Sequence, residues 1–188
     1  MHYNKMPLFR HNYVSVLFWT VAIICPLLLE RAGVLSEADL ILSPRNGYTS
    51  IITGQFLHGS WGHAVGNLIL ILLGSSLLYQ YYNKSYLRVT IWGLLAPGTF
   101  MYYLGKPTLG ISALGFAMIW FVVARGLMSR DISRFKIALF MIAFYGVTVF
   151  TAIPQSPMSR IAWEGHLAGL LVGVILAAIQ RMNFSKIK

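Results

Sequence analysis

The feature that most constrains the fold is a series of apolar runs, each close to the length that a helix needs to cross a bilayer. About 20 apolar residues span the roughly 30 Å of hydrocarbon. The 188-residue chain is 57% hydrophobic and only 11% charged, which leaves too few polar side chains to cover a water-soluble globule. We therefore predict an all-α membrane protein with a single domain over residues 1–188 and six spans, at residues 13–29, 63–81, 86–104, 110–124, 137–153 and 165–179.

The basic residues predict the orientation of these spans. Both tails, together with the second and fourth connections, hold 11 of the 15 Lys and Arg residues, and the other connections hold four. Because cytoplasmic loops retain basic residues, we expect both termini in the cytoplasm, so that spans two, four and six begin at the outer face. The long connection at residues 30–61 is moderately apolar and is expected to lie partly in the membrane interface.

Other function classes fit the composition less well. The net charge of +10 comes from residues between apolar runs, not from basic clusters interleaved with exposed aromatic residues, and this argues against nucleic-acid binding. Cys25 is the single cysteine, so no intrachain disulfide is expected. No small-residue cleavage site follows the first span, which is therefore expected to remain as an anchor.

Four polar side chains lie near the start of three different spans. His63 and Asn67 open span two, Ser112 opens span four and His166 opens span six. Each is costly in hydrocarbon and needs a partner or a purpose. Separately, the first two could be hydrogen-bonding links between helices, and the serine could bond back to its own helix. Their common depth at the outer face favours a shared site.

Small residues predict which helices meet at that site. They recur every four residues along span six, and span four offers a matching surface; the two stripes are Gly165, Gly169, Gly173 and Ala177, and Gly110, Ala113 and Ala117. Small residues allow two helix backbones to approach closely. If these stripes meet, Ser112 and His166 come within hydrogen-bond reach.

Span four is also too short for the bilayer. The thirteen residue steps from Ser112 to Arg125 give about 20 Å of helix, against roughly 30 Å of hydrocarbon. Ser112 should therefore lie below the surface, with residues 104–109 dipping in to meet it. Irregular backbone at such depth is tolerated where it is buried in protein or lines a water-filled cavity, so we expect a wet pocket beside the serine.

These motifs together resemble the rhomboid intramembrane serine proteases. The resemblance covers residues 48 to about 177, and it rests on three motifs in the family's order: His63-x-x-x-Asn67, Gly110-x-Ser112 and Gly165-His166-x-x-Gly169. It implies a six-transmembrane-helix rhomboid-like bundle. The sequence Phe56-Leu57-His58, ahead of span two, is also similar to the family.

The resemblance implies a function and roles for these residues. In a Ser–His dyad, His166 would take a proton from Ser112, which attacks a peptide carbonyl, while the Ser112 N–H, His63 and Asn67 hold the oxyanion beside Gly110. Phe116 stands where the family has an aromatic residue against the histidine ring. The implied partner is a membrane-protein substrate with a transmembrane segment, cleaved near the outer face of a bacterial inner membrane, without a cofactor or metal.

The chain departs from the family at two places. Ala113 follows the nucleophile where glycine is usual, and Tyr48-Thr49 stand where the family has Trp-Arg. The short chain is similar to small bacterial members, including the rhombosortase branch, whose substrates carry a C-terminal Gly-Gly anchor segment.

Three alternatives stay open at this stage. The departures suggest a rhomboid-like protein that binds transmembrane segments without cleaving them, although such proteins usually lack the serine or the histidine. A metal site made of His58, His63 and His166 is disfavoured because their spacing does not stack them and no Cys, Asp or Glu joins them. A transporter would need intramembrane charges and repeated halves, and the sequence shows neither.

Overall fold

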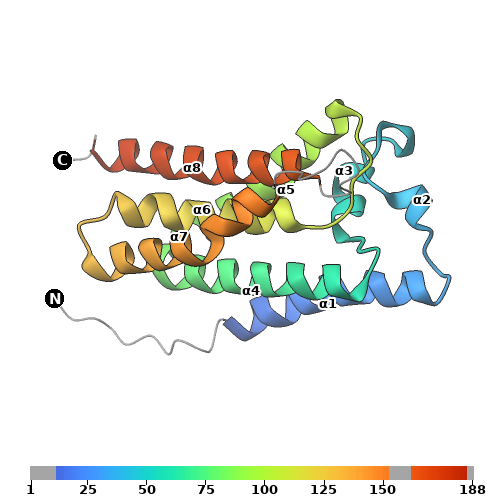
Figure 1. Ribbon diagram of the computed structural model, residues 1–188, viewed down its shortest axis with the longest axis horizontal. Helices are drawn as coiled ribbons and strands as arrows, with labels where there is room; N and C mark the ends of the chain where they lie inside the picture. The colour runs from blue at the N-terminus through green and yellow to red at the C-terminus, as the bar shows by residue number, and fades with distance from the viewer. Residues whose placement is uncertain (1–11, 153–161, 186–188) are drawn as a thin grey trace.

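The fold is a bundle of helices around one central helix. The computed structural model describes residues 12–152 and 162–185. Its long helices are α1 (Asn12–Arg31), α4 (Trp61–Tyr82), α5 (Tyr86–Leu104), α6 (Ser112–Leu127), α7 (Ile132–Ala152) and α8 (Trp163–Ser185) (Figure 1). Short helices fill the connections: α2 (Glu37–Leu40), η1 (Pro44–Asn46), α3 (Ser50–Thr53), η2 (Gly54–Phe56) and η3 (Asn83–Ser85).

Local sequence explains where several helices start and stop. The Ser60 hydroxyl accepts a hydrogen bond from the His63 N–H at 3.2 Å and so caps the start of α4. Gly105, with φ 72°, ends α5 in the left-handed conformation that glycine adopts without strain. By contrast, α6 begins at Ser112 and no side chain of the described residues caps its first turn. Its leading N–H groups therefore stay available to another acceptor.

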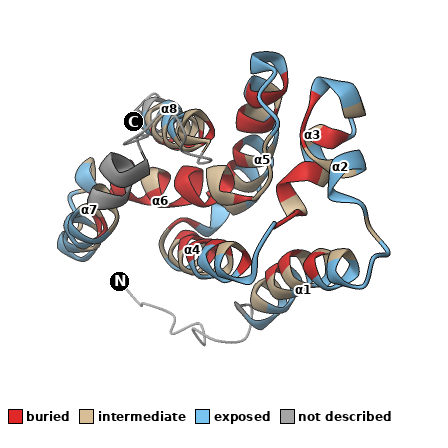
Figure 2. Ribbon diagram, turned by 45° about the vertical axis from the view of Figure 1, so that its right-hand side comes forward, coloured by how far each residue is buried: buried red, intermediate tan, exposed pale blue. Residues whose placement is uncertain are grey.

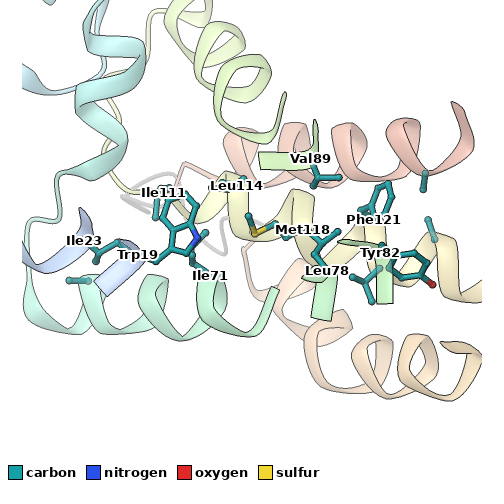
Figure 3. Close-up of a cluster of buried hydrophobic side chains, with 14 of the residues drawn as sticks. Trp19, Ile23, Ile71, Leu78, Tyr82, Val89, Ile111, Leu114, Met118 and Phe121 are labelled. Carbon is teal, nitrogen blue, oxygen red and sulfur yellow. The ribbon is translucent and has the colours of Figure 1, made fainter. Parts of the chain in front are cut away.

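The central helix is α6. It packs against α4, α5, α7 and α8, and 11 of its 16 residues are buried. Figure 2 shows this helix as a buried segment enclosed by its neighbours. The main apolar core runs along it, through Leu114, Met118 and Phe121, and continues to Trp19 of α1 (Figure 3).

Glycines allow α6 and α8 to approach each other closely. A methyl group on Gly169 would collide with the Ala113 carbonyl, and one on Gly173 would collide with the Ala117 carbonyl. Gly165 has more room, because its nearest neighbour is the Met101 side chain at 3.6 Å. The α6–α8 contact is therefore made by backbone against backbone at two turns of α8.

Several helices around α6 are long and apolar enough to cross a membrane. Three stretches of the described chain are helical, long and apolar enough to cross a membrane: Tyr13–Arg31, Trp61–Leu104, which contains α4 and α5, and Trp163–Arg181. The chain is thus an all-helical membrane protein over its described residues. The count of six spans and the cytoplasmic termini stay predictions, and residue 153, where the fifth predicted span ends, lies outside the described residues.

The connection between α1 and α4 is folded against the bundle. Leu42 and Thr108 exchange two backbone hydrogen bonds of 3.0 Å, which join this connection to the loop before α6. The Gln55 amide nitrogen donates to the Ile51 carbonyl at 2.6 Å and to the Leu94 carbonyl of α5 at 2.9 Å. These bonds hold the connection against α5 and against the loop before α6.

Candidate active site

Ser112 and His166 form a hydrogen-bonded pair. The Ser112 Oγ lies 2.8 Å from the His166 Nε2, and the two residues stand in the first turns of α6 and α8. The close approach of α8 to α6 at Gly169 sets this distance, because Gly169 lies one turn beyond His166. A serine hydroxyl in contact with an imidazole nitrogen is the arrangement that activates a serine nucleophile.

Phe116 orients the imidazole of His166. Their rings are stacked with centroids 4.6 Å apart and planes 5° from parallel. The other ring nitrogen of His166, Nδ1, is buried and has no hydrogen-bond partner among the described residues. The ring is therefore held by stacking on one side and by Ser112 at its edge, and no described carboxylate accepts its second N–H.

Gly110 places the predicted oxyanion residues beside the serine. Its φ of +100° is in the region that side-chain-bearing residues rarely adopt. A Cβ at this position would lie 2.7 Å from the His63 Nε2 and 3.0 Å from the Asn67 Nδ2. Both side chains thus converge on the backbone two residues before Ser112. The Asn67 Nδ2 is buried without a partner among the described residues, so it remains a free donor.

His58 lies behind His63. Its ring is fully buried and meets the His63 ring edge to face, with centroids 5.2 Å apart. Its Nδ1 bonds to the Phe56 carbonyl at 3.0 Å. Burial, and next the neighbouring His63, lower the pKa of His58 to about 4, so the ring is neutral at pH 7.

The three histidines weighed as a metal site are not gathered into one. No group of three or more His, Cys, Asp or Glu residues that could hold a metal ion occurs in residues 12–152 and 162–185. His58 and His63 are adjacent, whereas the His166 Nε2 is engaged by Ser112. The three rings therefore do not form a coordination sphere among the described residues.

A cavity of about 30 Å³ adjoins the Ser112–His166 pair. This volume holds one or two water molecules. Its walls include the small residues Gly98, Gly110, Ala113, Ala162 and Gly165. Gln55 and Thr108 also line it, and the Gln55 Oε1 and Thr108 Oγ1 are buried with no partner among the described residues. These oxygens are acceptors that a water molecule could satisfy.

An ion pair joins the loop before α6 to the start of α8. Lys106, in the loop before α6, pairs with Glu164 in the first turn of α8. This ion pair therefore links the segment that leads to Ser112 with the helix that carries His166. It adds a second tie between the two catalytic candidates, outside the core.

The structure brings together every site residue that the sequence suggests. His166 contacts both Ser112 and Phe116, and the side chains of His63 and Asn67 converge on Gly110 next to them. Of the packing residues, Gly169 touches α6 whereas Gly165 faces Met101. Sequence reasoning did not identify Gln55, Thr108 or the support that His58 gives to His63. Only the nearness of His58 to His63 in sequence could have indicated the last of these.

A match to a protein family covers most of the chain. A protein-family model described as Rhomboid domain matches residues 45–183. The matched region includes α4 to α8 except the last residues of α8, and with them all the site residues described above. No curated protein matches the chain.

Proposed function

Because this chain belongs to the rhomboid family, we propose that it is an intramembrane serine endopeptidase with Ser112 as nucleophile and His166 as general base. The family as a whole is one of membrane proteins that act on other membrane proteins, and the apolar helices of this chain suit that setting. The observation that carries the proposal is the 2.8 Å contact between the Ser112 Oγ and the His166 Nε2. Serine in such contact with a base is far more nucleophilic than a free hydroxyl.

The first half of the reaction forms an acyl-enzyme. The Ser112 Oγ attacks the carbonyl carbon of the scissile peptide bond while its proton passes to the His166 Nε2. The C–N bond then breaks, and His166 returns that proton to the leaving amine. Stacking on Phe116 keeps the imidazole in the plane that both transfers require.

The oxyanion forms beside Gly110. The N–H groups at the start of α6 lie at the positive end of the helix dipole. The Asn67 Nδ2 and the His63 ring converge on the same backbone, and together these groups supply donors from two helices. Donors placed in advance are the largest contribution to this kind of catalysis.

The second half of the reaction consumes water. A water molecule in the cavity beside Ser112 gives a proton to His166 and attacks the acyl carbon, and the ester bond to Ser112 then breaks with return of that proton. The Gln55 Oε1 and Thr108 Oγ1 supply acceptors that hold such a water within the cavity.

The setting that we propose is a six-span bundle in a bacterial inner membrane, with both termini cytoplasmic and cleavage near the outer face. Processing of C-terminal Gly-Gly anchor segments, as in the rhombosortase branch, is the substrate class that we propose. A second chain with one transmembrane segment is then the partner, and no cofactor takes part.

Covalent labelling tests the proposal. The full chain in detergent should react with a fluorophosphonate probe at Ser112, and Ser112→Ala and His166→Ala should abolish the labelling. Ser75→Ala is the matched control, because Ser75 is a buried serine on α4 that contacts the Met118 sulfur and no imidazole. A folded wild-type protein that neither labels nor cleaves a transmembrane substrate would refute the proposal.

A second function is favoured by one observation. Ala113 replaces the usual family glycine directly after the serine and lines the cavity, so a protein that binds transmembrane segments without cleaving them is the alternative. Under that alternative, Ser112→Ala would leave the cellular function intact, whereas the protease proposal requires its loss.

A further inference from the structure

The end of the bundle farthest from Ser112 is strongly basic. The α4–α5 junction, the α6–α7 junction and the last turns of α8 meet there (Figure 1). The described basic residues of these segments are Lys84, Arg88, Arg125, Arg130, Arg134, Lys136 and Arg181. Asp131 is the single acidic residue among them.

Two of these arginines converge on one tyrosine. The guanidinium carbon of Arg134 lies 5.2 Å from the centre of the Tyr82 ring, and that of Arg125 lies 6.0 Å from it. The three residues come from α4, α6 and α7. Tyr82 is buried at the end of the apolar core, next to Phe121 (Figure 3). A cluster made by three helices is a fixed feature of the fold, not a set of freely moving surface chains.

Hydrogen-bond donors in this cluster lack acceptors. The Tyr82 hydroxyl and the Arg125 Nε are buried and have no partner among the described residues. Buried polar groups are normally satisfied, so such groups need an explanation. A tyrosine hydroxyl and a guanidinium both donate readily to an anionic oxygen.

The nearby carboxylate does not fill this role. The Asp131 Oδ1 accepts hydrogen bonds from the Ser133 and Arg134 N–H groups and caps α7. Its Oδ2 lies 3.7 Å from the Arg134 Nε. Arg125 has no carboxylate partner in the described part of the chain, and Arg134 and Arg181 are close enough to repel its charge. An added anion would relieve that repulsion.

The surface beside the cluster is apolar. Along α7, just beyond Arg134, Phe135, Leu139, Phe140 and Phe144 are exposed. A free phosphate ion would gain nothing from these side chains, whereas the acyl chains of a lipid would cover them. Basic pockets between membrane helices are known to bind anionic head groups.

We propose that Arg125, Arg134 and Tyr82 bind the phosphate group of an anionic phospholipid whose acyl chains lie along α7. The two guanidiniums supply paired donors to the phosphate oxygens, and the tyrosine hydroxyl supplies a third. The site stands apart from Ser112, at the other end of α6, so it does not depend on the protease activity.

Native mass spectrometry of the full chain tests this site. The purified protein is titrated with phosphatidylglycerol or with phosphatidylcholine. We expect selective retention of phosphatidylglycerol, about fivefold weaker in Arg125→Gln and in Arg134→Gln, since each basic residue near a membrane surface contributes about 1 kcal/mol. Tyr82→Phe removes one donor without removing the ring and should weaken retention less than the arginine variants do.

Arg88→Gln is the matched control, because Arg88 is an exposed arginine at the same end of the bundle. Retention in this variant should equal that of the wild type. Equal losses in Arg88→Gln and Arg125→Gln would overturn the site in favour of unspecific attraction. A second measurement separates the sources of phosphate: thermal stabilisation by inorganic phosphate equal to that by phosphatidylglycerol would overturn the assignment to a lipid.

Discussion

At the scale of single residues, the site depends most on what Gly110 lacks. Its backbone adopts a conformation that disfavours side chains, and the space where a Cβ would project is taken by His63 and Asn67. The two donors can occupy their positions only because residue 110 has no side chain.

The substitution Gly110→Ala should therefore reduce activity much more than stability. The added methyl displaces the His63 ring and the Asn67 amide, and loss of one oxyanion donor costs about 10²-fold or more in kcat. Strain at the positive φ should cost about 1–2 kcal/mol. Cleavage rates and unfolding in detergent give the two quantities.

Gly66→Ala is the control for that substitution, because a Cβ at Gly66 on α4 would meet nothing within 4 Å. It should keep full activity and gain up to about 1 kcal/mol from helix propensity. Comparable activity losses in the two variants would show that the space at Gly110 is not what matters.

His58 predicts how stability depends on pH. The unfolded histidine binds a proton near pH 6.5, whereas the buried ring binds one only near its lowered pKa of about 4. Between these values only the unfolded state gains the proton, so stability falls as the pH is lowered from 6.5 towards 4. At pH 5 the loss from this group is on the order of 2 kcal/mol.

His58→Asn keeps a donor for the Phe56 carbonyl but removes the titration. Free energies of unfolding measured at pH 7 and pH 5 should therefore differ less in this variant than in the wild type. A variant with the same pH dependence as the wild type would assign the acid sensitivity to other groups.

The residues of the site differ in how far they can be predicted. Ser112 and His166 are foreseeable because small residues on both spans indicate which helices meet. Gln55 is not, since its position is set by hydrogen bonds to Ile51 and Leu94. A bond to a residue 39 positions away cannot be predicted from the local sequence pattern. Thr108 lines the cavity only because its backbone pairs with Leu42.

At the scale of helices, the contact between α6 and α8 decides whether the two catalytic candidates meet. The stripe of small residues predicts a close approach, but the tight positions are Gly169 and Gly173, not Gly165. Periodicity gives the face of a helix, whereas the crossing of two helices decides which turns touch.

Replacement of Gly173 tests that contact away from the site. Gly173→Val should destabilise the protein by about 1–3 kcal/mol, the usual range for overpacking, because the new side chain meets the Ala117 carbonyl and the Phe121 N–H. Thermal unfolding in detergent measures the change. Gly146→Ala on α7 is the control, since the added carbon only contacts Ile142 of its own helix at 3.7 Å, and a similar loss there would contradict the explanation.

The connection at residues 30–61 was the least predictable element. Its apolar stretch indicated association with the membrane interface but not the short helices α2, η1, α3 and η2. Of these, α3 and η2 are held by contacts with α5 and with the loop before α6. Contacts between segments so far apart in the chain leave no periodic signal in the sequence.

At the scale of the whole molecule, charge is divided between the two ends of the bundle. Four of the five acidic residues, namely Glu30, Glu37, Asp39 and Glu164, lie at the end where α6 begins, and the fifth, Asp131, lies among basic residues at the other end. Since basic residues are retained in the cytoplasm, the Ser112 end should face outwards.

Reporter fusions test this orientation. A fluorescent protein fused at the C-terminus should fold and fluoresce, because it stays in the cytoplasm, and an alkaline phosphatase fused there should be inactive. Fusions of both reporters to the connection at residues 30–61 should give the reverse result. Active phosphatase at the C-terminus would contradict the predicted orientation.

The enclosure of α6 also has a consequence for how the sequence can vary. Its 16 residues are too few for a long apolar span, yet this does not matter, because neighbouring helices and not lipid surround most of its surface. The length of α6 therefore need not match the thickness of the bilayer, but its side chains must fit the surfaces of the neighbouring helices. A survey of all single substitutions should therefore find α6 intolerant even of exchanges among apolar residues, while the exposed faces of α1 and α7 accept them freely.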